Sequence, residues 1–406
     1  MRVLYGVVGE GMGHATRSRV ILEHLLSQGH QLRIVVSGRA HKFLVDKLGG
    51  RAGVSIDEVE GFSLKFAGND LDVPASILSN IEKAPLALSK NLKVMHQVLE
   101  GFQPQVVISD FESVAYFYAR FHDLPVISID NMQVINRCRH EPMVSDDQSF
   151  AFRLAKLAVK AKLPGAYHYL VSSFFFPPVR KPRTTLVPPI LRPEILAAQR
   201  EPGDHVLVYQ TSSSNTQIVT ALQSLGHQQF RLYGMGRAGV EGNVTLCAFS
   251  ETGFVEDLRR ARAVIAGGGY SLMGEAVHLR VPMLSMPIGG QYEQELNARY
   301  LQQLGYGVHL DTEQRALDGD TISEFLARVP AMTCALESYQ PRDNSMLFAA
   351  VDELLHNVDM DEPAPQVLRS KAMGTWEGPK LPHHLQKAIE DEDDDSQPAR
   401  GREEGE

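Results

Sequence analysis

The chain has 406 residues, of which 43% are hydrophobic and 22% are charged, and these proportions predict a globular protein of two or three domains. It contains no apolar run long enough to cross a bilayer, and its three cysteines are too dispersed to form a metal site, so we expect a reduced, cytoplasmic protein. The net charge of −9 is concentrated at the C-terminal end, where Glu390 to Glu406 carries nine acidic and two basic residues. The remainder is nearly neutral, which argues against nucleic-acid binding.

Residues 358–406 are predicted to form a largely disordered acidic tail, because the final stretch has almost no apolar residue. Its DEDDD run has the residue types of a metal cluster, but nothing around it would hold ligands in a fixed geometry, so we interpret it as solvated. The lone Trp376 lies in a segment for which docking on a partner and docking on the body of the protein both stay open.

The first half of the chain alternates strand and helix patterns. Strands are predicted over 2–9, 30–38, 54–60, 104–110, 126–130 and 167–176, and helices over 14–29, 40–50, 112–125 and 149–163. The strands are apolar throughout rather than alternating with period two, which is typical of a parallel sheet covered by helices on both faces. Residues 1–180 are therefore predicted to form an N-terminal α/β domain.

The pattern restarts after a proline-rich connection over 181–202. Strands are predicted over 205–210, 229–234, 244–249, 263–266 and 282–286, and helices within 211–226 and over 254–261, 309–331 and 342–358. We therefore predict a second domain over 203–357, and a fold of two Rossmann-like, doubly wound α/β domains that face each other across a cleft. Ligands bind such sheets at the carboxyl ends of the strands.

The first predicted strand ends in a glycine loop that leads into a helix. The glycines of this loop are Gly9, Gly11 and Gly13. A dinucleotide fingerprint needs G-x-G-x-x-G, and the loop fails it because Thr16 occupies the last position. Arg39, just after the second strand, would suit a 2′-phosphate, so NADPH binding stays open as an alternative.

His14 lies at the start of this helix, where the positive helix end lowers the pKa of an imidazole and favours the neutral form that acts as a base. Asp110 ends the strand 104–110, so it lies at the same carboxyl edge of the predicted sheet. A carboxylate there would fix the tautomer of His14 and stabilise the imidazolium that forms. Helix capping is the alternative role for each of the two residues.

The stretch from Ala263 to Ala298 contains a strand, three glycines, a helix with an early carboxylate, a second strand and a polar loop. This order suggests a phosphate held over a helix N-terminus, with sugar hydroxyls bound by side chains nearby. The alternatives are a carboxylate at Glu275 that stabilises the helix dipole and a surface charge at Glu293.

Three segments carry a resemblance to a known family: GEGMGHATRS, VVISDFESVAYFYARFHDLPVIS, and Phe249 to Ala298. Together they resemble GT-B glycosyltransferases of the family 28 type and their UDP-glycosyltransferase relatives, a group that includes the lipid-intermediate N-acetylglucosaminyltransferase of peptidoglycan synthesis. The resemblance covers most of residues 1–355. It implies an acceptor-binding N-terminal domain in which His14 is the general base and Asp110 its partner.

The resemblance also implies a set of donor-binding residues in the C-terminal domain. Glu275 matches the glutamate that grips the ribose, and Phe249 matches the end of the uracil-binding strand. The phosphate contacts match Ser212, Ser213, Gly268, Gly269 and Tyr270, and the hexose contacts match Glu293 and Gln294. The peptidoglycan enzyme has two glutamines where this chain has Glu293 and Gln294, so a different sugar is expected.

The predicted reaction is an inverting, metal-independent transfer from a nucleotide-sugar, expected to be a UDP-sugar, to an acceptor hydroxyl, with no cofactor. A nucleotide-sugar 2-epimerase and a non-catalytic sugar-nucleotide-binding protein stay open as alternatives. The acceptor is undecided between a small molecule and a lipid-linked one. The basic amphipathic helix 149–163 fits peripheral contact with a membrane on its cytoplasmic face, and it also fits a packed helix with a solvated basic face.

Overall fold

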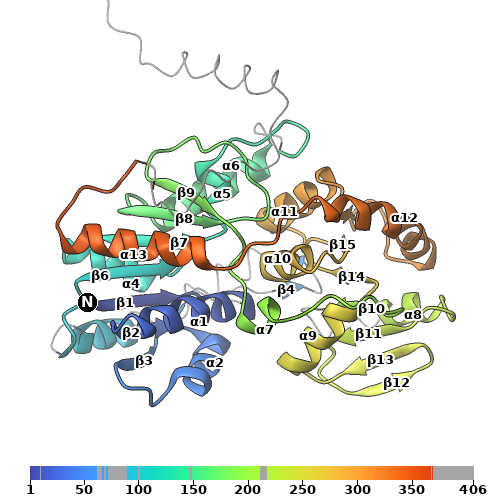
Figure 1. Cartoon of the computed structure of the whole chain (residues 1–406), viewed down its shortest axis with the longest axis horizontal. Coiled ribbons are helices and arrows are strands. Elements are labelled where there is room, and N and C mark those ends of the chain that lie inside the picture. The colour runs from blue at the N-terminus through green and yellow to red at the C-terminus, as the bar shows by residue number, and fades with distance from the viewer. Residues whose placement is uncertain are drawn as a thin grey trace, which may run out of the picture.

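The computed structural model describes residues 1–9, 11–61, 66–67, 70–71, 89–98, 101–145, 149–210, 217–366 and 368. They form the predicted pair of α/β domains, one at the left and one at the right of Figure 1. Ser212 and Ser213, the predicted phosphate contacts, lie outside the described residues, as do the lone Trp376 and most of the predicted acidic tail. No helix of the described part of the chain is long and apolar enough to cross a membrane.

The N-terminal sheet has seven parallel strands in the order β3-β2-β1-β6-β7-β8-β9. The strands are β1 Arg2–Val7, β2 Gln31–Val36, β3 Val54–Glu58, β6 Val106–Asp110, β7 Val126–Asp130, β8 His168–Ser172 and β9 Thr184–Val187, and a separate short hairpin joins β4 Phe66–Ala67 to β5 Asp70–Leu71. The helices are α1 Met12–Ser27, α2 Gly38–Leu48, α4 Ser113–Phe121, α5 Val134–Arg137 and α6 Phe150–Lys162. Val7 pairs with Asp110 at the end of the central strands, so α1 starts beside Asp110.

The C-terminal sheet also has seven strands, in the order β12-β13-β11-β10-β14-β15-β16. They are β10 Val206–Tyr209, β11 Phe230–Tyr233, β12 Gly239–Glu241, β13 Val244–Cys247, β14 Ala263–Ala266, β15 Met283–Ser285 and β16 Gly307–His309. The helices are α7 Pro193–Leu196, α8 Gln217–Gln223, α9 Glu251–Arg260, α10 Tyr270–His278, α11 Tyr292–Gln303 and α12 Gly319–Glu337. Only the antiparallel β12 departs from the parallel pattern among these strands. The sequence analysis did not predict the two edge strands of this sheet, β12 and β16.

The predicted helix over 309–331 is displaced in the structure. Its first residue, His309, belongs to β16, and α12 begins only at Gly319. There the Asp318 side chain caps the helix by accepting a hydrogen bond from the amide of Thr321 at 2.8 Å. The helix then continues past Pro330 to Glu337. The proline is thus an interior residue of α12 and not its end.

The structure also moves two segments from their predicted domains to the N-terminal domain. β9 lies in the predicted connection, but it pairs with β8 as an edge strand of the first sheet. The last helix, α13 (Ser345–Asp359), was predicted in the C-terminal domain, but it packs its apolar face into the core beneath the first sheet (Figure 1). There the ring of Phe348 stacks on His24, with centroids 4.1 Å apart. An amphipathic pattern shows that a helix covers a sheet, but it does not show which one.

Candidate active site

A cavity of about 300 Å³ lies between the two domains at the carboxyl ends of their strands. His14, Arg17 and Asn131 line it from the N-terminal domain. Glu275, Glu293 and Phe249 line it from the C-terminal domain. Most of the residues predicted from the two glycine-rich stretches therefore face one shared space.

The N-termini of α1 and α10 meet at this cavity. A Cβ atom on Gly13 would lie 2.6 Å from Oγ of Ser271, so a glycine is needed for the two helices to approach this closely. Among the described residues neither helix has a side-chain cap or an acidic residue in its first turn. Two helix N-termini with uncompensated backbone N–H groups provide a favourable site for an anion such as a diphosphate.

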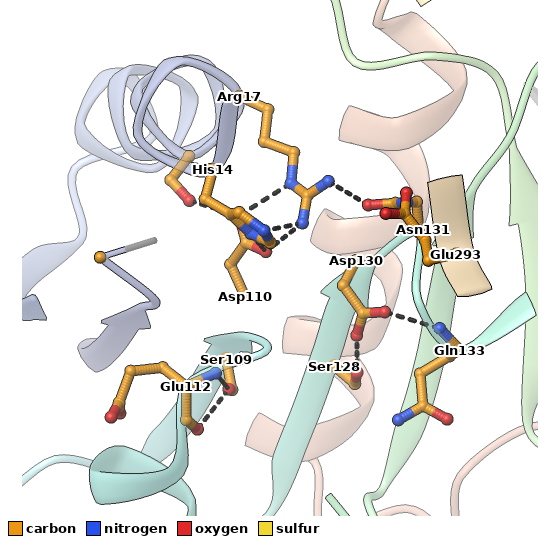
Figure 2. Close-up of polar contacts among 12 residues, drawn as sticks. His14, Arg17, Ser109, Asp110, Glu112, Ser128, Asp130, Asn131, Gln133 and Glu293 are labelled. Atoms are coloured by element: carbon orange, nitrogen blue, oxygen red, sulfur yellow. Dashed lines mark hydrogen bonds and ion pairs between the residues drawn. The ribbon is translucent and has the colours of Figure 1, made fainter. Parts of the chain in front are cut away.

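The predicted partners His14 and Asp110 are in contact. Nδ1 of His14 lies 2.8 Å from Oδ1 of Asp110, as Figure 2 shows. The capping alternative for Asp110 is wrong, because Glu112 caps α4 by accepting hydrogen bonds from the amides of Val114 and Ala115. The N-cap of α1 is Gly11, so His14 does not cap its helix either.

Arg17, which the sequence analysis did not single out, also binds this pair. Its Nε donates to Oδ2 of Asp110 at 2.9 Å, and its Nη2 binds Oδ1 of the same carboxylate and lies 2.7 Å from Nδ1 of His14. The hydroxyl of Ser18 donates to Oδ2 at 2.8 Å. Asp110 is thus a fully buried carboxylate that is charge-paired with a bidentate arginine.

The pKa values of both titratable groups of this pair are lowered, for different reasons. Burial raises the pKa of the Asp110 carboxyl, but Arg17 and then His14 outweigh it and hold that pKa well below its usual range. Burial, followed by the positive charge of Arg17, lowers the pKa of His14 against the opposing influence of Asp110. His14 is therefore neutral at pH 7, and its side chain is 19% exposed at the cavity.

A chain of hydrogen bonds runs from Arg17 across the cleft to α11. Nη1 of Arg17 donates to Oδ1 of Asn131 at 2.5 Å, and Nδ2 of Asn131 donates to Oε1 of Glu293 at 2.6 Å (Figure 2). Asn297 donates to the same Glu293 oxygen at 2.6 Å. Burial raises the pKa of Glu293, and the two amides only partly offset this effect. Glu293 is therefore a cavity residue rather than a solvated surface charge.

Gln294 also lines the cavity, and its side-chain amide makes several hydrogen bonds within the C-terminal domain. Its Oε1 accepts hydrogen bonds from the amides of Gly268 and Ile288 at 3.0 and 3.2 Å, and its Nε2 donates to Gln291. A Cβ on Gly268 would lie 2.5 Å from that of Gln294, so this glycine serves close packing of α11. Both polar ends of Gln294 and the Gly268 amide are used internally. Gly269 and the start of α10 at Tyr270 remain at the cavity for an anion.

Glu275 lines the cavity and is held by an arginine from the interdomain connection. Nε and Nη2 of Arg192 donate to its two oxygens at 2.8 and 2.9 Å. Burial raises the pKa of Glu275, and Arg192 opposes the rise. The helix-dipole alternative is wrong, because the first turn of α10 has no acidic residue.

Aromatic side chains form the end of the cavity nearest β13. Phe249 follows this strand, is 76% exposed and lines the cavity together with Phe43 and Phe254. Tyr270 also lines the cavity, but its buried hydroxyl is hydrogen-bonded to Ser172 at 2.9 Å. Its side chain therefore joins the domains, while Phe249 offers an open ring face for stacking.

Comparison with known proteins decides the family. The model of glycosyl transferase family 1 matches residues 1–330. The chain belongs to this family. It is a glycosyltransferase, and the match favours this activity over the epimerase, the non-catalytic and the NADPH alternatives. The family number differs from the family 28 type that the sequence motifs resemble.

Relatives and solved structures agree with this assignment. The glycosyltransferase is 26% identical over 329 residues to an uncharacterized glycosyltransferase of Methanosarcina acetivorans, with 76% of this chain and 85% of the relative covered. A UDP-glucosyltransferase from Polygonum tinctorium capable of glucosylating indoxyl superimposes with a TM-score of 0.61 at 15% identity, over 88% of this chain and 98% of that one. MurG of Acinetobacter baumannii has a TM-score of 0.55 at 15% identity, over 87% and 99%. These likenesses show the GT-B fold.

Three site residues of this glycosyltransferase escaped the sequence analysis. Arg17 lies three positions after His14 and so on the same helix face, a signal that was present but unused. Asn131 directly follows the strand 126–130 and so lies at the carboxyl edge of the sheet. Arg192 stands in an irregular connection, where no periodicity or motif places a side chain.

Proposed function

We propose that this glycosyltransferase moves a sugar from a UDP-sugar to an acceptor hydroxyl, with inversion at the anomeric carbon and without a metal ion. The observation that carries the proposal is the contact between His14 and Asp110 at a cavity that also receives the N-terminus of α10. A base and an anion site thus face each other across one space. The UDP donor is supported by the UDP-glucosyltransferase neighbour and by a neighbour of the same fold solved with UDP.

In the proposed reaction His14 removes the proton of the acceptor hydroxyl as its oxygen attacks the anomeric carbon. The new carbon–oxygen bond forms on one face of the sugar while the bond to the diphosphate breaks on the other, and the bonding electrons leave with UDP. The helix N-termini at Gly269 and Gly11 stabilise the charge on the departing diphosphate. The proton remains on His14 until it passes to solvent.

The tautomer of His14 decides whether it acts as this base. If Nδ1 carries the proton, it donates to Asp110 and leaves the lone pair of Nε2 for the acceptor. We assign this tautomer because the Asp110 carboxylate can only accept, and because Nη2 of Arg17, which also lies 2.7 Å from Nδ1, donates to Oδ1 of that carboxylate. Arg17 is then a positioning residue that fixes the carboxylate and limits the charge on His14.

On the donor side, Phe249, Glu275 and Glu293 each take a part of the nucleotide-sugar. The uracil stacks on Phe249, and Glu275, held by Arg192, accepts hydrogen bonds from the ribose hydroxyls. Glu293 accepts from a hydroxyl of the donor hexose, and the amides of Asn131 and Asn297 keep it in place. Gln294 is left out of this set because its amide is used internally.

The test is His14→Ala, measured as transfer to an acceptor and as affinity for the UDP-sugar. Transfer is expected to fall by about 10³-fold or more because the base is lost, while donor affinity stays nearly unchanged. His24→Ala is the matched control, since His24 lies on the same helix but binds Asp352 of α13 at 2.8 Å. Equal loss of transfer and donor affinity in His14→Ala, or loss of neither, would contradict the assignment. Epimerised product from the UDP-sugar alone would also contradict it.

A further inference from the structure

One helix of the N-terminal domain turns an apolar stripe outward. On α6, Phe150 is 80% exposed, Leu154 53% and Leu157 62%, and their spacing of four and three residues puts them on one face. Phe152 and Val159, on the opposite face, are buried in the core. The helix thus buries one apolar face and exposes a second apolar face to water. A packed helix with a solvated basic face does not account for the second apolar face.

Basic side chains lie along one flank of this stripe. Arg153 and Lys160 are exposed on the side of α6 next to the apolar stripe, and Lys156 is half-buried on the same side. A neighbouring loop adds Arg180 and Lys181. Nζ of Lys181 donates a hydrogen bond to Oδ1 of Asn136 at 2.5 Å. Burial, and then the positive charges around it, lower the pKa of Lys181 to about 8. The flank is thus an electropositive surface next to an apolar one.

Two further exposed aromatic side chains lie on α4, which contacts the segment just after α6. The hydroxyl of Tyr116 donates to the carbonyl of Pro164, just beyond the end of α6, at 2.6 Å. The ring of Phe117 lies 5.5 Å from that of Tyr116 and is 60% exposed, and Phe121, one turn later, is 83% exposed. We name the whole surface the α4–α6 face, made of Phe117, Phe121, Phe150, Leu154 and Leu157.

The helix α6, which carries part of this face, packs with its buried side near the base side of the active site. At the end of α6, the ammonium of Lys162 lies 5.2 Å from the ring centroid of Phe111, the residue after Asp110. At the other end, Phe152 of α6 packs edge-on against Tyr292 of α11, at 5.4 Å. In Figure 1 α6 lies at the upper edge of the molecule, away from the C-terminal sheet. A molecule anchored at this face would therefore lie next to the acceptor side of the cleft.

We propose that the α4–α6 face docks on an anionic lipid bilayer, and that the acceptor hydroxyl belongs to a lipid-anchored molecule in that bilayer. Exposed phenylalanine and leucine side chains enter the interfacial region, and the basic flank meets the anionic headgroups. Charge complementarity selects a bilayer over a neutral apolar partner. The acceptor assignment rests on the proposed function, because it needs His14 to be the base.

The experiment is sedimentation of the full chain with vesicles of phosphatidylcholine alone and of phosphatidylcholine mixed with phosphatidylglycerol. We expect binding to the anionic vesicles only. Leu154→Ser with Leu157→Ser should lower the partition coefficient by about tenfold or more. Arg153→Gln with Lys160→Gln should lower it by about fivefold per charge. Val240→Ser is the matched control, because Val240 is 73% exposed on β12 in the other domain and should change nothing.

Equal binding to neutral vesicles, or no loss in the leucine variant, overturns the proposal. A dimer that dissociates in the leucine variant also overturns it, since a second copy would then cover the face. UDP affinity, measured by calorimetry on the same samples, shows that the variants are folded. It also separates the two proposals: lost vesicle binding with intact UDP binding counts against the bilayer alone, and a chain that binds vesicles but not UDP counts against the proposed function.

Discussion

Two buried carboxylates that face each other across the cleft, Asp110 and Glu293, are held in different ways. On the N-terminal side, Asp110 is gripped by Arg17 and His14, and its pKa is held low. On the C-terminal side, the hydrogen-bond donors to Glu293 are the neutral amides of Asn131 and Asn297, and burial raises its pKa. The carboxyl group of Asp110 is therefore a permanent charge. That of Glu293 is a responsive hydrogen-bond partner, because its ionisation depends on the groups that it contacts. The permanent charge suits a base that must become cationic, and the responsive one suits the recognition of neutral hydroxyls.

The largest effect is expected from removing the permanent charge. Asp110→Asn should lower kcat by about 10³- to 10⁴-fold, because the wrong tautomer of His14 is favoured and the imidazolium loses its counter-charge. It also leaves the buried Arg17 unpaired, so we expect a loss of about 3–5 kcal/mol in the free energy of unfolding. Steady-state kinetics and urea unfolding measure the two effects.

The matched control for this variant is Asp130→Asn. Asp130 is also buried, at the end of the next strand, and burial raises its pKa to about 6. It accepts hydrogen bonds from the hydroxyl of Ser128 and the amide of Gln133 and not from His14. Should the two variants lose kcat equally, the contact between His14 and Asp110 would be structural and not catalytic.

Arg17→Gln tests whether the arginine sets the protonation of His14. His14 acts as a base only when neutral, so activity falls as the pH drops through its folded pKa. Because burial and Arg17 lower that pKa, the acid limb of kcat/KM should lie below pH 6.5 in the native enzyme. Without the arginine the limb should move to higher pH, and Arg17→Lys should move it partly back.

The control for this shift is Arg19→Gln. Arg19 is a buried arginine on the same helix, but it binds Glu194 at 2.9 Å rather than Asp110. It should change stability and leave the acid limb where it is. An unmoved limb in Arg17→Gln would limit the arginine to a structural role.

A smaller effect is expected from the responsive carboxylate. Glu293→Gln exchanges a carboxylate, which two amides hold in place and which only accepts hydrogen bonds, for an amide that also donates. We therefore expect the choice among donor hexoses to change by about tenfold to a hundredfold in kcat/KM. Affinity for UDP itself should stay the same. Glu295→Gln is the control, since Glu295 pairs with Arg299 and His309 instead. Weaker UDP binding in Glu293→Gln would place this residue at the nucleotide.

The contrast between the two sides was only half visible in the sequence. Strand ends in a parallel sheet meet at one edge, so the sequence placed His14 and Asp110 at the same edge and made their contact a hypothesis. Which other side chains reach that edge depends on rotamers and on the packing of the second domain, so Arg17 was missed although it shares a helix face with His14. The pairing of Glu275 with Arg192 spans 83 residues and comes from an irregular connection, where no pattern predicts a contact. The sequence also did not predict which sheet α13 covers, because tertiary packing decides this.

The smallest effect concerns the point where the two sides touch, at Gly13 and Ser271. In an isolated helix, Gly→Ala stabilises by about 0.5–1 kcal/mol, so Gly13→Ala would be expected to stabilise α1. Here the new Cβ would lie 2.6 Å from Oγ of Ser271 and 3.2 Å from its Cβ, so we expect a destabilisation of about 1–3 kcal/mol and a raised KM for the donor.

Removing the hydroxyl of Ser271 separates the steric clash from the intrinsic effect of Gly→Ala on helix stability. In a Ser271→Ala background the closest atom is gone and the second contact needs only a shift of a few tenths of an ångström, so Gly13→Ala should become nearly neutral. Thermal unfolding of the four proteins of this double-mutant cycle gives the coupling between the two sites. A coupling near zero would mean that α1 and α10 do not approach as closely as the structure has them, and that the two helix N-termini do not share one anion.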